Sequence, residues 1–214
     1  MLLSTAFFPP VSWFAAAAKD FTLSPDRVFP SVVRLEAWEH YQKQSYRNRC
    51  RILTAGGIED QRVPVVHDPG LYHLPVTAVR VDYSTPWIPK LERAIASAYD
   101  SSAFFTYYKD GIFDLLESRP ETLWDLNLVL IRHLAERLGL ALNIRPTERF
   151  EPEAPEDFRN RIHPKRPNTI LQDLALEKPY FQVFAGKYGF QSDLSVLDLL
   201  FNEGPDAISY LKRI

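Results

Sequence analysis

Residues 2–19 read LLSTAFFPPVSWFAAAAK, and residues 32–36 read VVRLE. The first seven of these residues are a short apolar run that ends at Pro9, which predicts a buried strand. The alanines that follow favour a helix, with Ser12 as its N-cap. Residues 32–36 predict a second strand after an irregular stretch at 21–30. A strand, a helix and a strand in this order indicate a parallel pair, and therefore an α/β fold.

The next predicted feature is a β-hairpin. Residues 49–54 (RCRILT) and 61–66 (QRVPVV) are two apolar runs, and the two consecutive glycines between them suit a turn. Pro64 has no N–H to donate, so the second strand should lie at an edge. Alternating valines over residues 76–84 predict a further strand.

The middle of the chain is predicted to be helical. Residues 84–100 predict a helix with Pro86 at its first position and the preceding threonine as its cap. Leucines at every third or fourth position make residues 122–140 the clearest helix. Thr122 and Asp125 form a capping-box pattern at its start.

The last third of the chain mixes short elements with one long loop. Residues 141–145 predict a strand, and the charged, proline-rich residues 146–168 predict an extended excursion over the surface. A strand at 180–184 and helices from 195–202 onward follow. These elements predict an α/β fold in one mixed domain over residues 1–214, with a βαβ start, an edge β-hairpin and a helical second half.

The composition is that of a folded protein in a reducing compartment. Of the 214 residues, 46% are hydrophobic, which suffices for a core. The single cysteine, Cys50, excludes an internal disulfide. The first residues lack a basic region and are interrupted by two prolines, so they do not predict a signal peptide. Because no run of about 18 apolar residues exists, we expect a cytoplasmic protein without a membrane span.

The stretch HYQKQSYRNRCRI, residues 40–52, gathers hydrogen-bond donors in one place. Residues 39–51 carry a net charge of +3, whereas the whole chain carries −2. This contrast favours a small ligand bearing phosphate or carboxylate over nucleic acid, whose general binders are basic throughout. Arginine would hold such a group as a fork and lysine as a point charge. The alternative is a solvated loop that leads into the hairpin. The candidate ligand-binding residues of this stretch are Tyr41, Gln42, Lys43, Arg47, Asn48 and Arg49.

The loop after the first strand supplies two more candidates, Phe8 and Pro9. In α/β folds, ligands bind outside the carboxyl ends of parallel strands. We therefore expect one cleft with the following lining: Phe8, Pro9, Tyr41, Gln42, Lys43 and Arg47. Arg47 also has a structural alternative, a buried ion pair with Glu36 or Asp82.

His163, in the segment IHPKRPN, is the candidate catalytic base. Prolines fix its surroundings, and an imidazole can accept a proton near neutral pH. The alternative is a surface histidine on a mobile loop. Asp198 is the candidate that would orient His163, if the two meet in space. Its own alternative is a capping box with Ser195 at the start of a helix.

Motifs of several other classes are missing from the sequence. No glycine-rich fingerprint supports a dinucleotide or Walker-type site, and no GxSxG is present. No HxxxH or CxxC spacing suggests a metal. We therefore expect neither a cofactor nor a metal ion.

Several strings, in their order along residues 6–210, resemble those of the WbqC-like family, in its Bacteroidetes type. They are FFPPVSWF, YQKQSYRNRC, VRVDYSTPW, SAYDSSAFF, HPKRPN and DLSVLDLLFNEGP. The stretch FTLSPDRVFPS departs from the family pattern as an insertion. The resemblance implies a role at O-antigen loci, in the transfer of an amino acid such as glycine, or a similar acyl group, to an amino sugar. It also implies a functional place for His163, Pro164 and Lys165 beside the basic stretch, with Lys165 as a ligand-binding residue.

Two functional hypotheses follow. The first is a cytoplasmic transferase acting on a nucleotide-activated amino sugar, in which His163 accepts the proton that the attacking amine loses. The second is a binding module that recognises an anionic glycan precursor or nucleotide sugar without chemistry. The position of His163 relative to the basic stretch discriminates between them.

Overall fold

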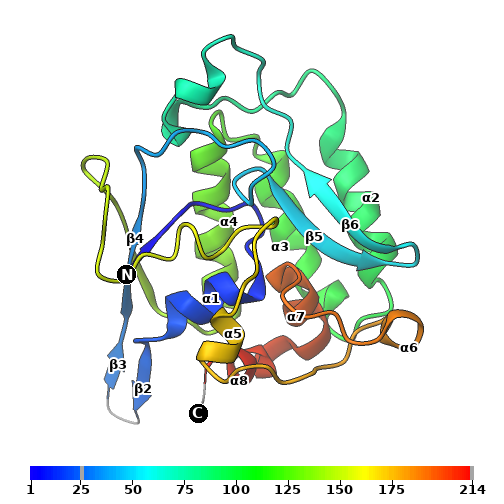
Figure 1. The fold of residues 1–214 in the computed structure, drawn as a ribbon. Coiled ribbons are helices and arrows are strands. Elements are labelled where there is room, and N and C mark those ends of the chain that lie inside the picture. Colours follow the sequence, from blue (N-terminus) through cyan, green and yellow to red (C-terminus); the bar gives the residue numbers. More distant parts are fainter. Residues whose placement is uncertain (25–26, 213–214) are drawn as a thin grey trace.

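A computed structural model describes residues 1–24 and 27–212, and it confirms the mixed α/β fold. The βαβ start consists of β1 (Leu2–Leu3), α1 (Val11–Ala18) and β4 (Ser31–Leu35), with β1 and β4 parallel. Strand β7 (Leu142–Pro146) joins the other side of β4, also in parallel, as predicted for 141–145. The sheet order is therefore β1-β4-β7. Figure 1 shows β4 beside the N-terminus, from which β1 begins.

The stretch between α1 and β4 is more regular than predicted. Strands β2 (Thr22–Ser24) and β3 (Arg27–Phe29) pair antiparallel. The crossover thus carries a small hairpin, where the sequence indicated only an irregular insertion.

Helix α1 is buried on every side. Ala15 to Ala18 are fully buried, and the helix contacts β4 and the later helices α5, α7 and α8. Small side chains suit this position because neighbours approach from all directions. The prediction of Ser12 as N-cap was wrong: Pro10 occupies that position, and Ser12 lies inside the helix.

The predicted hairpin is present with a different return strand. Strands β5 (Arg49–Thr54) and β6 (Gly57–Arg62) pair antiparallel from Thr54↔Gly57 to Arg49↔Arg62. The turn needs only two residues, and Gly57 has a φ of 110°, a value that favours glycine. Because the return begins this early, Pro64 lies beyond the strand.

The predicted strand at 76–84 is not formed. Val76–Ala78 is a 3-10 turn, and the residues after it make single bridges, Val65↔Val81 and Arg80↔Thr122. The partners of these bridges come from different segments, so no ladder propagates. Another 3-10 turn spans Leu71–His73.

Three helices make up the predicted helical middle. They are α2 (Trp87–Tyr99), α3 (Phe105–Glu117) and α4 (Leu123–Arg137). The Thr122 hydroxyl accepts a hydrogen bond from the Asp125 N–H at 3.0 Å, which confirms the predicted start of α4. Helix α2 begins one residue later than predicted, at Trp87, and has no side-chain cap.

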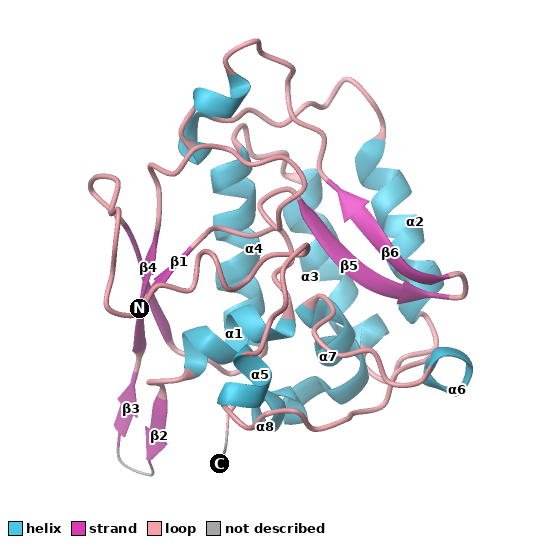
Figure 2. Cartoon of the chain, in the orientation of Figure 1, coloured by secondary structure: helices cyan, strands magenta, loops and turns pink. Residues whose placement is uncertain are grey.

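The last third of the chain winds over the other elements. Residues 147–169 form no helix or strand, in agreement with the predicted excursion (Figure 2). The predicted strand at 180–184 is wrong, since these residues are irregular. The helices here are α5 (Ile170–Asp173), α6 (Ala185–Tyr188), α7 (Val196–Glu203), the 3-10 turn η3 (Gly204–Ala207) and α8 (Ile208–Leu211).

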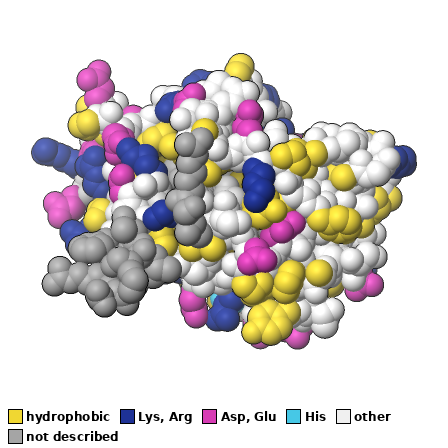
Figure 3. Space-filling model, turned by 90° about the horizontal axis from the view of Figure 1, so that it is seen from below, with side chains coloured by type: hydrophobic (Ala, Val, Ile, Leu, Met, Phe, Trp, Pro, Cys, Tyr) yellow, Lys and Arg dark blue, Asp and Glu magenta, His cyan; other side chains and the backbone are white. Residues whose placement is uncertain are grey.

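One contiguous set of buried apolar side chains connects the sheet, the hairpin and the helices. On the face shown in Figure 3, charges of both signs are mixed with scattered apolar side chains. Within residues 1–24 and 27–212, no helix is both long and apolar enough to cross a membrane.

Candidate functional site

The basic stretch lies between β4 and β5 and forms a wall with two sides. Tyr41 and Lys43 line one cleft, whereas Gln42 and Arg47 line another. Gln44 has a φ of 63°, so the chain turns sharply in the middle of the stretch. The single predicted cleft is therefore divided between two places.

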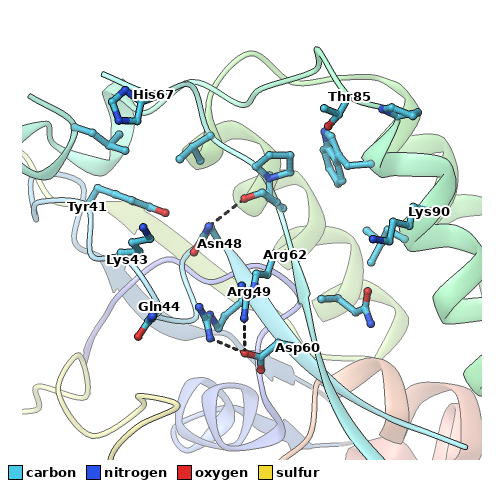
Figure 4. Close-up of a pocket in the computed structure, with 18 of the residues that line it drawn as sticks. Tyr41, Lys43, Gln44, Asn48, Arg49, Asp60, Arg62, His67, Thr85 and Lys90 are labelled. Atoms are coloured by element: carbon cyan, nitrogen blue, oxygen red, sulfur yellow. Dashed lines mark hydrogen bonds and ion pairs between the residues drawn. The ribbon is translucent and has the colours of Figure 1, made fainter. Parts of the chain in front are cut away.

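The first cleft, here called the basic cleft, has a volume of about 740 Å³. The hairpin and residues 41–49 form one side, and the start of α2 faces them (Figure 4). The loop at 63–72 closes the end. A cavity of this size accommodates a ligand as large as a nucleotide.

Positive charge predominates in the basic cleft. Lys43, Arg49, Arg62 and Lys90 line it together with one carboxylate, Asp60. Arg49 Nη1 contacts Asp60 Oδ2 at 2.5 Å, and Arg62 Nη2 lies 3.6 Å from the same oxygen. Lys43 and Lys90 form no ion pair among the described residues. The net charge of +3 favours an anionic ligand.

Aromatic rings form the apolar part of the basic cleft. The rings of Tyr41 and Tyr72 stack, with centroids 6.3 Å apart and planes inclined by 19°. Trp87 lines the opposite side, at the start of α2. Burial raises the pKa of the Tyr41 hydroxyl, which therefore remains protonated and available as a donor.

Three buried polar atoms at this cleft lack a hydrogen-bond partner among the described residues. They are Asn48 Oδ1, Arg49 Nε and Trp87 Nε1. The other end of the Asn48 amide is fixed, because Nδ2 donates to the Val63 carbonyl at 3.0 Å. A buried polar group without a partner costs about 1–3 kcal/mol, and these three belong to side chains that line the cleft.

Arg47 does not face the basic cleft. Its guanidinium binds the buried carboxylate of Glu39 through Nε and Nη2, with Nε 3.0 Å from Oε1. Nη2 also donates to Ser4 Oγ at 3.2 Å. Arg47 therefore forms the buried ion pair that was its structural alternative, but with Glu39. The two expected partners are engaged elsewhere, since Glu36 binds Arg159 and Asp82 accepts from the Ser84 N–H.

Phe8 and Pro9 line neither cleft, so their predicted place beside Tyr41 was wrong. Both are buried, and Phe8 has a φ of 41°, a strained value for a bulky residue. The Ser195 hydroxyl donates to the Phe8 carbonyl at 3.0 Å, and the Val196 N–H donates to the Pro9 carbonyl at 2.8 Å. The start of α7 therefore covers this loop.

The N-terminus of α1 is likewise occupied from within the chain. The Asp193 carboxylate accepts from the Ser12 N–H at 2.8 Å and from Asn168 Nδ2 at 2.7 Å. Burial raises the pKa of Asp193. The position where an α/β fold could bind an external anion thus holds the protein's own carboxylate.

The segment around His163 does reach the basic stretch. Lys165 Nζ donates to Gln44 Oε1, and Gln44 lines the basic cleft. Burial, and then the positive charges of Arg166, Arg47, Lys165 and Arg49, lower the pKa of His163. His163 Nδ1 accepts from the Lys165 N–H at 3.1 Å, so the neutral ring carries its proton on Nε2.

Asp198 lies elsewhere, in the first turn of α7. Its carboxylate accepts from Gln182 Nε2 at 2.9 Å and faces the hydroxyls of Tyr99 and Tyr180. Burial raises its pKa to about 6. No hydrogen bond or ion pair joins it to His163 in the described part of the chain. Asp198 does not form the expected capping box either, because Ser195 Oγ accepts from the Leu197 N–H instead.

The sequence interpretation missed most of the residues that line the cleft. Arg62 could have been found from the hairpin, because it stands directly opposite Arg49 in the observed register. Tyr72, Trp87 and Lys90 carried no such signal, since they come from a loop and a helix that only the tertiary fold brings here.

The fold and this cleft define a mixed α/β protein with a basic, aromatic-lined cleft beside its hairpin. A model of the WbqC-like protein family matches residues 33–165, and the chain belongs to this family. The chain is also 26% identical over 195 residues to the uncharacterized protein Rv1507c of Mycobacterium tuberculosis, covering 80% of this chain and 84% of that protein. No solved structure matches the chain.

Proposed function

We propose that the chain binds a nucleotide-activated sugar in the basic cleft. The observation that carries the proposal is the combination of a +3 charge with aromatic rings in one cavity. Phosphates need the cations, and a nucleobase needs an aromatic surface and a few fixed polar groups. The ligand class suits a precursor of an O-antigen-like surface polysaccharide, the role that the family's name suggests.

The two lysines and the stacked tyrosines have different tasks in this proposal. Lys43 and Lys90 approach the phosphates from opposite sides of the cleft (Figure 4). The Tyr41–Tyr72 pair offers a flat surface to the base. Asn48 and Trp87 line the cleft and each carry one buried polar atom without a partner, an acceptor and a donor, which would meet the ligand's polar edge once the side chains turn toward the cavity.

Isothermal titration calorimetry with uridine diphosphate, uridine and inorganic phosphate tests the proposal. We expect the diphosphate to bind most tightly, because it alone engages both halves of the cleft. Lys43→Ala and Lys90→Ala should each weaken its binding by about tenfold to a hundredfold, the effect of one charge-assisted contact. Arg93→Ala is the matched control, since Arg93 is an exposed cation on the same helix as Lys90 but does not line the cleft.

Absence of binding by any of the three compounds to the folded protein would refute the proposal. Equal losses in Lys90→Ala and Arg93→Ala would refute it as well, because the effect would then reflect overall charge. Circular dichroism of each variant establishes that it is folded.

The second candidate is transfer of an aminoacyl or acyl group to the amine of the bound sugar. The bond between Lys165 and Gln44 favours it, because it holds the His163 segment at the rim of the cleft. In this reaction the amine nitrogen attacks the acyl carbon, the leaving group departs, and the amine proton moves to a base. His163 can be that base only after Nδ1 releases the Lys165 N–H. Mass spectrometry of a nucleotide-activated amino sugar incubated with glycyl and acetyl donors tests for the product.

A further inference from the structure

The second cleft lies where the three parallel strands end. Ser4 follows β1, Glu36 follows β4 and Thr147 follows β7. The Ser4 hydroxyl donates to Glu39, and the Thr147 hydroxyl donates to Glu36. The cleft in front of them, here called the sheet-end cleft, has a volume of about 480 Å³. Its lining includes Trp38, Glu39, Gln42, Arg47, Phe150 and Arg159. The carboxyl edge of a parallel sheet is a common ligand position in α/β folds.

The charges in the sheet-end cleft compensate one another. Glu39 Oε1 accepts a hydrogen bond from Arg47 Nε. Glu39 Oε2 accepts from Arg47 Nη2 and from the Ser4 hydroxyl. Burial raises the pKa of Glu39, whereas Arg47 opposes that change. Neither partner of this pair retains a free charge for a ligand.

Arg159, the other cation of the cleft, is equally engaged. Its Nη1 donates to the fully buried Glu36 at 3.2 Å, and its Nε donates to Asp157 at 2.9 Å. Nη2 donates to Asp157 and to the Pro152 carbonyl. This cleft therefore differs from the basic cleft, where Lys43 and Lys90 pair with no carboxylate within residues 1–24 and 27–212.

Two aromatic rings at the sheet-end cleft are exposed and yet fixed in place. Trp38 is 48% exposed and Phe150 is 53% exposed. The indole N–H of Trp38 donates to the Thr147 carbonyl at 3.2 Å. The guanidinium of Arg159 lies 5.6 Å from the centre of the Phe150 ring. Exposed apolar rings that line a cavity offer stacking surfaces to a ligand.

We propose that the sheet-end cleft binds an uncharged sugar ring. A pyranose presents apolar C–H faces to Trp38 and Phe150 and hydroxyl groups to neutral polar side chains. The amides of Gln42 and Asn160 line the cleft. Their oxygens accept from Arg47 and Arg166, so their NH2 groups, which have no partner among the described residues, are the donors for the sugar hydroxyls. A charged ligand would find Glu39, Arg47 and Arg159, the ions in the lining, already paired, and a purely apolar ligand would desolvate the two amides without compensation.

This inference concerns a different cavity from the nucleotide site and does not depend on it. Residues 39–49 separate the two clefts, so a sugar in the sheet-end cleft contacts the opposite side of the same wall. Variants of each cleft can therefore be tested against the ligand of the other.

Saturation-transfer NMR and calorimetry with methyl α-glucoside, methyl N-acetylglucosaminide, glucuronate and maltotriose test the inference on the full chain. We expect neutral pyranosides to bind. Phe150→Ala should weaken their binding by about tenfold, and Gln42→Ala by about fivefold. Phe181→Ala is the matched control, because Phe181 is a similarly exposed phenylalanine outside both clefts. Comparing the affinities for maltotriose and methyl α-glucoside shows whether the cleft binds a unit of a glycan chain or a single sugar.

Three results would overturn the inference. They are no binding by any pyranoside, tighter binding of glucuronate than of the glucoside, and equal affinities of Phe150→Ala and Phe181→Ala. Lys43→Ala should leave sugar binding unchanged, so a failure of the nucleotide proposal and a failure of this one are separable.

Discussion

At the scale of single residues, the basic stretch contains an arginine at every second position from 47 to 51, and each of the three has a different environment. Arg47 binds Glu39, Arg49 binds Asp60 in the basic cleft, and Arg51 donates to the Tyr46 hydroxyl at 2.7 Å. Nothing in the spacing of these arginines distinguishes them. Glu39 precedes Arg47 by eight residues, but the pairing requires the intervening chain to turn back at Gln44. The sequence therefore located the basic stretch without separating its structural cation from those that line the cleft.

Arg47→Ala should strongly destabilise the fold. The substitution leaves the buried carboxylate of Glu39 without its counter-ion, and breaking a buried pair in this way costs about 3–5 kcal/mol. Chemical denaturation without ligand measures the loss in the free energy of unfolding. Lys43→Ala, an exposed neighbour, should change it by less than about 0.5 kcal/mol.

A double variant separates the stranded charge from lost packing. In Glu39→Gln with Arg47→Met, neither charge remains, so the loss should be smaller than in Arg47→Ala alone. A single Arg47→Ala variant as stable as Lys43→Ala would contradict the buried pair.

At the scale of elements, local signals sufficed where an element makes its own hydrogen bonds. The helix predicted over 122–140 forms at Leu123–Arg137 with its capping threonine, because both stripe and cap lie within the segment. The strands predicted at 76–84 and 180–184 failed because a strand needs a neighbouring strand, which sequence alternation cannot supply.

Residues 180–184 show what replaced the expected ladder. Gln182 is buried, and its side chain bonds to the backbone of Gln191 at both the N–H and the carbonyl, and to the carboxylate of Asp198. A side-chain network thus connects this segment to α7, with Tyr99 at the end of α2 facing the same carboxylate.

Asp198→Asn should raise stability at high pH and change it little at low pH. Burial raises the folded pKa of Asp198 to about 6, above the unfolded value of about 3.9. The folded state therefore binds the proton more tightly, and stability present below the unfolded pKa is lost as the pH rises through about 6. From below the unfolded pKa to above the folded pKa, ionisation of Asp198 lowers the free energy of unfolding by on the order of 3 kcal/mol. Asparagine keeps an acceptor for Gln182 and carries no charge.

Denaturant unfolding of both proteins at about pH 5 and about pH 8 measures roughly half of this difference, about 1.4 kcal/mol, because the unfolded carboxyl group is already ionised at pH 5. Asp110→Asn, at an exposed position on α3, is the control and should show no comparable change between the two pH values. An Asp198→Asn effect that is equal at both pH values would exclude a buried, titrating carboxyl group at this position.

At the scale of the whole molecule, the two clefts differ in charge on a chain with a net charge of −2. The excess of positive charge was predicted from residues 39–51; two of its four cations, Lys43 and Arg49, line the basic cleft, and β6 and α2 add Arg62 and Lys90. The compensated charges of the sheet-end cleft could not be predicted, because Arg159 comes from the 146–168 excursion, whose path the sequence does not specify. That the chain forms one domain over 1–214 stays a prediction.

Salt should therefore separate the ligands of the two clefts. The screening length falls from about 10 Å at 0.1 M salt to about 3 Å at 1 M, which weakens attraction between exposed charges. Lys43 and Lys90 are exposed, so the affinity for uridine diphosphate should fall by about tenfold or more over this range. Binding of methyl α-glucoside should change by less than about twofold, because hydrogen bonds to neutral amides and stacking on aromatic rings carry no net charge. Calorimetric titrations of the same protein at both salt concentrations measure the two affinities. Parallel losses for the two ligands would mean that both bind through unpaired charge, and the assignment of an uncharged ligand to the sheet-end cleft would then be wrong.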